Sequence, residues 1–460
     1  MKIKVIPKSF PEVENIKTYQ NKKPCKQTAF WRFIMRMVAK KDLEDCHFSY
    51  ETEGMEKLNK NEPCLILMNH SSSTDLEMVA EIFHDREFHI VTTLDGFIGK
   101  EWLMRQIGCI PARKFITDMP LIKDILHCLN DLKASVVMFP EASYSFDGTA
   151  TKLPSSVGKC LKLFKVPVVM VTTTGSFHRD PLYNGLQKRD VTVSARVKYL
   201  LSPTDIKEKS VSELNDILKR EFTFDHWRWQ RENGIKVSEE FRADGLHRVL
   251  YKCPVCGKEK TLTGKGINLS CSFCKMVWVL TDDGSLVKQN ISENEIHDNN
   301  SINANPASIS QAHTTYLERN YDFSYISDWY RWERDSVKKE ITEGKYYLDI
   351  PVDIIAVKDT KAAYRIGEGR LVHNINGFTL TGCNGELSYS QSPKHSYSLY
   401  ADYFWYEIGD MISIGDMNVQ YYCFPKDSGV NVAKVRLATE EIYKLDIPSA
   451  KKDLSTLAGL

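Results

Sequence analysis

The sequence predicts an α/β domain with a mostly parallel sheet, then a small metal-binding unit, then a β-rich C-terminal domain. Between residues 46 and 200, short apolar runs alternate with segments of helical periodicity, which is typical of a parallel sheet covered by helices. Two Cys-x-x-Cys pairs follow within residues 253–274. Residues 345–445 then hold about seven strand-like runs and a final helical segment.

Length and charge narrow the possible functions. A chain of 460 residues is expected to form about two to four domains. Its 61 Lys and Arg balance 60 Asp and Glu, so the overall charge favours neither nucleic acid nor an anionic membrane, and we expect no nucleic-acid partner. The 12 cysteines include several in apolar runs, which indicates reduced thiols and a reducing compartment. We expect neither a signal peptide nor a membrane-spanning segment.

Changes in composition suggest five regions. The first residues are polar with two prolines and predict an irregular arm, whereas the Asn- and Ser-rich stretch after the cysteines predicts a partly disordered linker. The expected boundaries are 1–27 for the arm, 28–245 for the α/β domain, 246–282 for the metal-binding unit, 283–322 for the linker and 323–460 for the β-rich domain with its closing helix.

Within the α/β domain, the apolar runs predict the strands and the periodic segments predict the helices. The expected strands are Leu65–Met68, Phe88–Thr92, Ser135–Phe139, Val166–Thr172 and Val191–Tyr199, and the expected helices are 75–84, 99–107, 119–133 and 155–164. In such sheets, functional side chains gather at the carboxyl ends of the strands.

His70 follows one of these strand ends, and Asp75 begins the next helical segment. The small polar residues between them allow the loop to turn back, so Asp75 can accept a hydrogen bond from one ring nitrogen of His70. The other nitrogen then faces outward as a general base. Roughly one such spacing is expected by chance in this composition, so the pair depends on its context.

Two further segments carry candidate polar side chains, one after a strand-like run and one in a turn after the predicted helix 99–107. Pro140 ends its strand and holds Glu141 just beyond it, although a lone acid here is more often a solvated loop residue. The turn from Gly108 to Arg113 presents a guanidinium that suits a phosphate, the alternative being an ordinary surface arginine.

Together these segments resemble the glycerolipid acyltransferase family of the lysophosphatidate acyltransferase type, over roughly residues 28–220. That family shows Asn-His-x-Ser-x-x-Asp, Gly-x-x-x-x-Arg, Phe-Pro-Glu-Gly and a Val-Pro-Val strand. The matching residues, in the same order, are Asn69, His70, Ser72, Asp75, Gly108, Arg113, Phe139, Pro140, Glu141, Val166 and Pro167. Ala142 replaces the family's glycine and Tyr144 its arginine, which leaves a different acceptor lipid open.

The resemblance implies an acyltransferase of phospholipid biosynthesis. His70, oriented by Asp75, would deprotonate a hydroxyl of a lysophospholipid such as 1-acylglycerol-3-phosphate. The alkoxide would attack the thioester of acyl-CoA or acyl carrier protein, and loop amides or hydroxyls would stabilise the oxyanion. The residues expected to bind the acceptor are Arg113, Glu141, Ser72, Gly108 and Pro140. The alternative is a non-catalytic lipid-binding or adaptor protein with the same fold.

The spacing C-x2-C-x14-C-x2-C predicts a structural zinc site, with Cys253, Cys256, Cys271 and Cys274 as ligands. Four thiolates occupy all four coordination positions of a tetrahedral ion and leave none open for catalysis. The segment resembles a zinc ribbon, and an iron-loaded or degraded site is the alternative.

Two regions suggest contacts beyond the substrate. A helix at 26–42 carries a stripe of Arg32, Arg36 and Lys40 beside many apolar residues; it suits a membrane interface about as well as packing on its own domain. The aromatic residues of 222–229 either cover the edge of the α/β domain or enter a membrane interface. We therefore expect a cytoplasmic protein peripherally attached to the inner face of the membrane.

The C-terminal domain resembles a pleckstrin-homology-type barrel in its strand number and closing helix, Asn431–Leu445. Without a basic cluster in its first loop, protein contact or substrate presentation is favoured over phosphoinositide binding. Gly369, Gly377, Gly385 and Gly415 are expected at turns, between the runs Tyr346–Val357, Ala362–Ile366, Arg370–Ile375, Gly377–Thr381, Gly385–Gln391, Tyr397–Tyr406, Met411–Ile414 and Gln420–Phe424.

Overall fold

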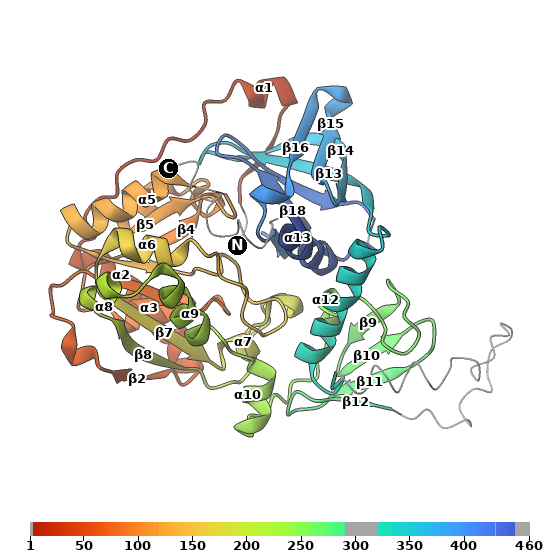
Figure 1. Ribbon diagram of the computed structural model, residues 1–460, viewed down its shortest axis with the longest axis horizontal. Helices are drawn as coiled ribbons and strands as arrows, with labels where there is room; N and C mark the ends of the chain where they lie inside the picture. The colour runs from red at the N-terminus through yellow and green to blue at the C-terminus, as the bar shows by residue number, and fades with distance from the viewer. Residues whose placement is uncertain (1–2, 117, 290–320, 428, 447–460) are drawn as a thin grey trace, which may run out of the picture.

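The computed structural model describes residues 3–116, 118–289, 321–427 and 429–446. It has three parts: an α/β domain, a small four-stranded ribbon and a C-terminal β domain, with helix α12 (Ile326–Thr342) between the last two (Figure 1). Most of the predicted linker lies outside the described residues.

The α/β domain contains a seven-stranded sheet that is mostly parallel, as predicted. Only β7 and β8 pair in the antiparallel sense. In spatial order the strands are β2 (Ser49–Glu53), β8 (Ser194–Leu201), β7 (Val168–Thr174), β3 (Leu65–Met68), β6 (Ser135–Met138), β4 (Phe88–Thr93) and β5 (Cys109–Ala112). Two strands were not predicted: β2 is exposed along its whole length, and β5 occupies part of the expected Gly/Pro turn.

Helices cover both faces of this sheet because alternate residues of its central strand point to opposite sides. Ile66 and Met68 of β3 pack with Val79 in one core, whereas Leu65 and Leu67 pack in the other. The helices of the domain are α2 (Ala29–Asp45), α3 (Asp75–Ile82), α4 (Glu101–Gln106), α5 (Met119–Leu126) with a π-helical extension (His127–Asp131), α6 (Val157–Phe164), α7 (Ser176–Arg179), α8 (Pro203–Glu208), α9 (Val211–Glu221) and α10 (His226–Glu232).

The predicted irregular N-terminal arm contains two short regular elements near its start, and residues 15–28 have neither helix nor strand. Strand β1 (Val5–Pro7) pairs in parallel with β14 (Ala363–Asn374) of the C-terminal domain, and α1 (Phe10–Glu14) follows. Further along the arm, the Tyr19 amide donates a hydrogen bond to the Lys358 carbonyl, just after β13 (Leu348–Val357) of the C-terminal domain. A three-residue strand whose partner lies more than 350 residues away leaves no local sequence pattern.

The C-terminal domain is an antiparallel sheet closed by α13 (Val432–Asp446), within one residue of the predicted helix. The spatial order is β16 (Leu387–Gln391), β15 (Gly377–Gly382), β14, β13 (Leu348–Val357), β19 (Gln420–Pro425), β18 (Gly409–Gly415) and β17 (Tyr400–Trp405). The likeness to a pleckstrin-homology barrel stays a prediction.

The turn expected at Gly369 is wrong, because the runs on either side of it form the single strand β14. A Cβ at Gly369 would lie 2.4 Å from the Thr381 carbonyl oxygen and 2.6 Å from the Ile354 side chain. The glycine therefore permits close approach of neighbouring strands, a role that its sequence context does not distinguish from a turn.

The ribbon has four antiparallel strands, and they extend beyond the predicted boundary at residue 282. The strands are β9 (Leu262–Lys265), β10 (Asn268–Cys271), β11 (Val277–Leu280) and β12 (Leu286–Lys288). Since β12 pairs with β11, the start of the predicted linker belongs to the ribbon instead.

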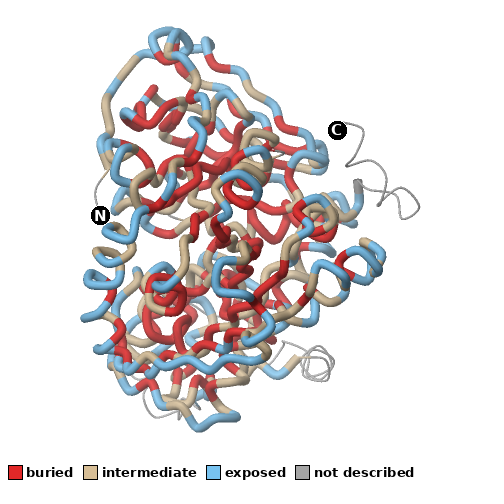
Figure 2. The backbone as a smooth tube through the Cα atoms, turned by 90° about the vertical axis from the view of Figure 1, so that its left-hand side faces the viewer, coloured by how far each residue is buried: buried red, intermediate tan, exposed pale blue. Residues whose placement is uncertain are grey.

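The three parts share a continuous core. Trp227 of the α/β domain, Trp278 of the ribbon and Trp329 of α12 lie in one apolar cluster with residues of the β domain. Buried segments accordingly run through the middle of the molecule (Figure 2). None of the described helices combines the length and apolar character that crossing a bilayer requires.

The β domain packs against loops at the strand-end edge of the α/β sheet. Ile98 and Phe115, from loops that follow β4 and β5, share an apolar cluster with Trp405 and Phe424. The Trp405 indole also donates a 2.9 Å hydrogen bond to the buried Asp95 carboxylate. This edge is where the sequence places the candidate catalytic residues.

Candidate active site

The structure brings His70 and Asp75 together between the end of β3 and the start of α3. The Nδ1 atom of His70 lies 2.8 Å from Oδ2 of Asp75. The same carboxylate oxygen accepts hydrogen bonds from the backbone amides of Ser71, at 2.9 Å, and Ser72, at 3.2 Å. Asp75 thus orients the ring with Nδ1 as the donor, which leaves the Nε2 lone pair free to accept a proton.

Two aromatic rings flank the imidazole of His70. The ring centroids of Phe139 and Tyr144 lie 4.3 Å and 4.2 Å from that of His70. Burial lowers the pKa of His70, and the positive charge of Lys114 lowers it further, although Asp75 acts in the opposite direction. The imidazole is therefore neutral at neutral pH, the form that a general base requires.

Glu141 is buried beside this pair, and both of its carboxylate oxygens have protein partners. One oxygen accepts the backbone N–H of His70 at 3.0 Å, and the other accepts that of Thr151 at 2.7 Å. Burial raises the pKa of Glu141 to about 7. The side chain links the end of β3 to the loop after β6 and so fixes the backbone of His70; its predicted contact with an acceptor stays a prediction.

The residue after Glu141 explains part of the departure from the family pattern. Ala142 has φ +58°, in the left-handed region where glycine is favoured. The backbone therefore keeps the conformation that the family's glycine would adopt without strain.

The hydrogen bonds of the Arg113 guanidinium go to the N-terminal arm. It donates to the carbonyl of Tyr19 at 3.0 Å and to Asn21 Oδ1 at 3.3 Å, and its predicted contact with an acceptor stays a prediction. The neighbouring residue, Lys114, is the cation whose charge acts on His70, and its Nζ lies 3.7 Å from the ring centroid of Tyr400.

The other three predicted acceptor-binding residues have structural contacts. Ser72 hydrogen-bonds the Thr74 hydroxyl, at 2.7 Å, and the buried carboxylate of Asp180. Gly108 has φ +88°, and a Cβ there would lie 2.8 Å from the Phe88 carbonyl oxygen. Pro140 is buried in the turn after β6. Their predicted roles in acceptor binding stay predictions.

Sequence reasoning missed three side chains around His70. Tyr144 stands where the family has an arginine, and this replacement of a cation by an aromatic ring was the sequence signal for it. Lys114 adjoins Arg113, so a second cation in that segment was visible. Asp180, whose carboxylate accepts hydrogen bonds from Ser72 and Ser73, follows the end of β7, a strand-end position like that of His70.

The four cysteines of the ribbon fit a tetrahedral metal ion. Their Sγ atoms all lie within 4.8 Å of one another. The Cys253–Cys274 and Cys256–Cys271 pairs are 3.7 Å and 3.8 Å apart. A zinc–sulfur bond of about 2.3 Å implies a separation of about 3.8 Å between thiolates in a tetrahedron. The cluster therefore has the ligand type and spacing for a metal ion.

Comparisons with known proteins give one family match, and it lies within the α/β domain. A crystal structure of a 1-acyl-sn-glycerophosphate (LPA) acyltransferase, PlsC, from Thermotoga maritima is 18% identical over 41% of this chain and 77% of that one. Its TM-score is 0.34, too low to support an argument. A comparison with curated proteins found no match. A family model described as acyltransferase matches residues 49–174, which include His70, Asp75, Arg113 and Glu141, so the first half of the chain contains an acyltransferase-type domain.

Proposed function

We propose that this protein is an O-acyltransferase that moves a fatty acyl group to a hydroxyl of a lysophospholipid, such as 1-acylglycerol-3-phosphate. The acyl donor is acyl-CoA or acyl carrier protein. The observation that carries the proposal is the His70–Asp75 hydrogen bond at a strand end, inside the segment that matches the acyltransferase family.

In the proposed reaction, Nε2 of His70 takes the proton of the acceptor hydroxyl. The resulting oxygen nucleophile attacks the thioester carbonyl and forms a tetrahedral oxyanion. As this collapses, the new ester forms, the carbon–sulfur bond breaks, and the departing sulfur takes the proton back from His70. Asp75 stabilises the transient imidazolium, as the carboxylate of a catalytic triad does. The chemistry requires no covalent enzyme intermediate.

The thiolates of the ribbon would hold a zinc ion with a structural role. When bound, such an ion supplies folding free energy by linking two chain segments, and four thiolates leave no position for a substrate. Cys253 and Cys271 lie in the core that the ribbon shares with α12 and the β domain. Loss of the ion would therefore disturb the junction between the three parts.

An exposed apolar surface on α2 and α4 supports attachment to a membrane. Two cations of the expected stripe have protein partners, because Arg32 donates to the Gln27 carbonyl and Arg36 pairs with Glu81 of α3 at 2.7 and 2.8 Å. The side chains of Arg36 and Lys40 nevertheless stay exposed, and apolar side chains are exposed on the same helix. The exposed apolar side chains are Phe30 (62%), Phe33 (59%), Met37 (53%), Val38 (72%) and, from α4, Trp102 (67%) and Leu103 (40%).

We assign this apolar surface to the membrane interface, where the lipid acceptor resides. The Trp31 and Trp102 rings meet at 5.8 Å and link the two helices into one surface. The proposal thus places the protein peripherally on the inner, cytoplasmic face of the membrane.

Vesicle binding tests the membrane assignment. Phe33→Asp introduces a charge into the apolar surface and should weaken cosedimentation with phosphatidylglycerol vesicles at least tenfold. Ile375→Asp is the control, because Ile375 is equally exposed (59%) but lies on the β domain. Equal binding of the two variants would contradict the assignment.

A non-catalytic lipid-binding role is the second candidate. One observation favours it: His70 lies between two aromatic rings, and neither of the two cavities described for this structure includes it among the lining residues. In that case the chain would bind lysolipid without turnover.

An acyl-transfer assay separates the two candidates. Purified protein would be incubated with acyl-CoA or acyl carrier protein and a panel of lysolipids. His70→Ala should lower the rate at least ~10³-fold, since it removes the base. His127→Ala is the matched control, because Nδ1 of His127 also meets an aspartate, Asp131, at 2.6 Å. Activity of His70→Ala near that of the control would sink the proposal.

A further inference from the structure

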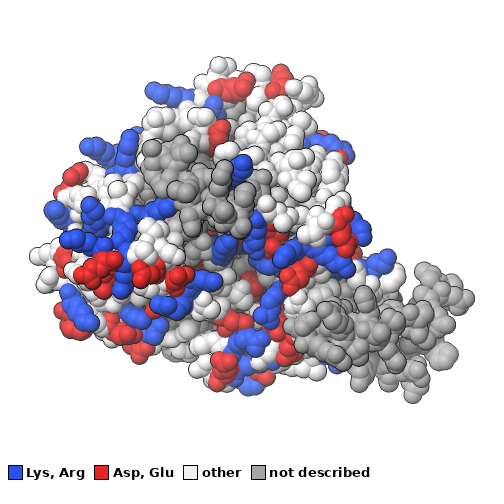
Figure 3. Space-filling model, in the orientation of Figure 1, with Lys and Arg blue, Asp and Glu red and all other residues white. Residues whose placement is uncertain are grey.

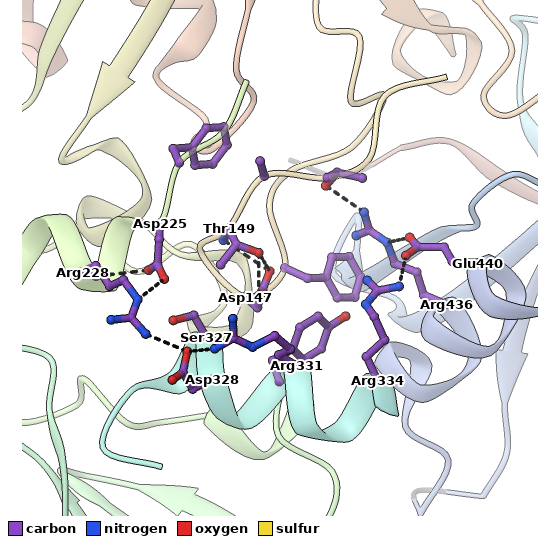
Figure 4. Close-up of a pocket in the computed structure, with 15 residues that line it drawn as sticks. Asp147, Thr149, Asp225, Arg228, Ser327, Asp328, Arg331, Arg334, Arg436 and Glu440 are labelled. Carbon is purple, nitrogen blue, oxygen red and sulfur yellow. Dashed lines mark hydrogen bonds and ion pairs between the residues drawn. The ribbon is translucent and has the colours of Figure 1, made fainter. Parts of the chain in front are cut away.

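A cavity of about 360 Å³ lies where the α/β domain meets the two helices of the C-terminal half. Its walls come from the loop 146–151, the start of α10, and helices α12 and α13 (Figure 4). It is separate from the ring of His70. The volume is in the range of small-molecule sites.

Four arginines line this cavity, from three different helices: Arg228, Arg331, Arg334 and Arg436. On the face of the molecule seen in Figure 3, Lys and Arg are interspersed with Asp and Glu. Four carboxylates, from Asp147, Asp225, Asp328 and Glu440, line the same cavity, so what it offers a ligand is unused guanidinium N–H groups and not a large net positive charge.

The cavity also holds carboxylates, and each already accepts hydrogen bonds from the protein. Asp225 caps α10 by accepting the amides of Trp227 and Arg228, and Asp147 accepts from Thr149. Glu440 accepts from Ser398 at 2.7 Å and from Arg334 at 2.6 Å. The carboxylate oxygens in the cavity wall thus already accept hydrogen bonds from protein donors.

Donors in the wall outnumber these acceptors. A guanidinium has five N–H groups. Arg331 is hydrogen-bonded through Nη2 to Asp328, and Arg334 through Nη1 to Glu440 and Glu441. Among the described residues, these are the only hydrogen bonds that these two guanidinium groups make, so several N–H groups remain for a ligand.

Two buried polar atoms at the cavity have no partner within the described part of the chain. They are Nη1 of Arg436, a residue 3% exposed, and Oγ of Ser327, a residue 7% exposed. A buried donor without an acceptor costs about 1–3 kcal/mol. Both atoms have almost no accessible surface, so an oxygen-rich ligand in the cavity would satisfy them once the two side chains turn toward it.

We infer that this cavity binds a small phosphate-bearing anion. A phosphoryl group offers three oxygens to several donors at once, and guanidinium matches it bidentately. The aromatic side chains of Phe224 and Tyr330 in the wall suit the carbon skeleton that carries the phosphate. The phosphoryl group belongs either to a free metabolite or to the coenzyme A part of an acyl donor.

Binding at this cavity is connected to His70 through three hydrogen bonds. Nη2 of Arg436 donates to Thr151 Oγ1 at 3.1 Å, and the Thr151 amide donates to Glu141 at 2.7 Å. Glu141 in turn accepts the backbone N–H of His70. A ligand bound in the cavity should therefore reduce the motion of the loop after β6, which holds Thr151 and Glu141 and positions the His70 backbone. The binding site itself does not depend on the proposed acyl transfer, whereas an effect of occupancy on turnover does.

Calorimetric titration of the full-length protein tests the site without any acyl-transfer assay. The probes are inorganic phosphate, glycerol 3-phosphate and coenzyme A. Arg331→Gln should raise the Kd of the bound probe at least tenfold. The control is Arg370→Gln, since Arg370 is about as exposed as Arg331 (60% against 57%) and also pairs with one aspartate, but lies on the β domain.

Binding of phosphate or glycerol 3-phosphate would identify a free metabolite as the ligand, and binding of coenzyme A alone would identify the acyl donor. No saturable heat with any probe, or equal Kd values for the two variants, would overturn the site.

Two further measurements separate ligand binding from a structural role. Ser327→Ala should raise the Kd about threefold or more without lowering the melting temperature, since the hydroxyl has no hydrogen-bond partner among the described residues. The bound probe should also slow hydrogen exchange at the Thr151 amide. An unchanged Kd in Ser327→Ala would remove Ser327 from the site, and unchanged exchange would refute the connection to His70.

Discussion

Two histidine–aspartate pairs in the α/β domain have nearly the same distance and very different surroundings. Nδ1 to Oδ2 is 2.8 Å in His70–Asp75 and 2.6 Å in His127–Asp131. The side chain of Asp75 is 1% exposed, whereas that of Asp131 is 65% exposed. The first pair joins a strand end to a helix start, and the second lies four residues apart on a helical surface.

The difference teaches that a short histidine–aspartate distance alone does not mark a candidate catalytic pair. Asp75 is fixed by the amides of Ser71 and Ser72, so it holds one ring orientation of His70. Asp131 faces water, where an ion pair is worth little. Burial also keeps His70 neutral, since it lowers the pKa of the ring.

The largest expected effect comes from breaking the buried pair. Asp75→Asn keeps the shape of the side chain but no longer stabilises the imidazolium, and kcat should fall by roughly 10³–10⁴-fold, as in catalytic triads. Asp131→Asn should leave kcat within twofold of wild type. The two variants would be compared in the acyl-transfer assay, and a similar small loss in both would remove the distinction between the pairs.

An intermediate effect, on stability, is expected from substitution of Glu141. This carboxylate holds the backbone of His70, and the His127–Asp131 pair has no such carboxylate among its described contacts. Glu141→Gln replaces one accepting oxygen with an NH₂ group that cannot accept the His70 or Thr151 amide. The free energy of unfolding should fall by about 1–3 kcal/mol, measured by urea denaturation. As a control, Glu232→Gln at the end of α10 should change it by less than 0.5 kcal/mol, as is usual for surface positions. Equal stability of both variants would argue against the link through Glu141.

The smallest effect concerns the pH dependence of kcat/KM. The proposed general base, His70, must be neutral to act, and its pKa is lowered. We therefore expect kcat/KM to stay high until the pH falls through a value below 6.5. Removing the nearby charge with Lys114→Met should raise the pKa of His70 and move this acid limb to higher pH. Lys123→Met, at an exposed position on α5, should not move it. A shift to lower pH in Lys114→Met would contradict the electrostatic account.

Lys114→Met also removes the positive charge that acts on the buried Asp402. The double variant Lys114→Met/Asp402→Asn removes both charges and provides the same test. Burial raises the pKa of Asp402 and Lys114 opposes that shift, so removing both charges together avoids an isolated buried carboxylate. The acid limb should move in the same direction as in the single variant.

The sequence alone determined the elements whose partners lie nearby in the chain. The central strand before His70, the helix that begins at Asp75, and the paired cysteines all follow from short patterns, because strand alternation, helix starts and tight turns act over a few residues. For the same reason the closing helix α13 was predicted within one residue.

Tertiary structure alone decided the roles of residues whose partners are distant. Arg113 holds the arm at Tyr19, 94 residues away; β1 joins a sheet formed mostly by residues 348–425; and Trp405 reaches Asp95 over 310 residues. Such contacts depend on which domains pack together, and no local pattern encodes them. The strand-end position of His70 and Asp75 was therefore predictable, whereas the β domain that packs against the same edge, and the arginine-lined cavity at its junction, emerged only from the folded chain.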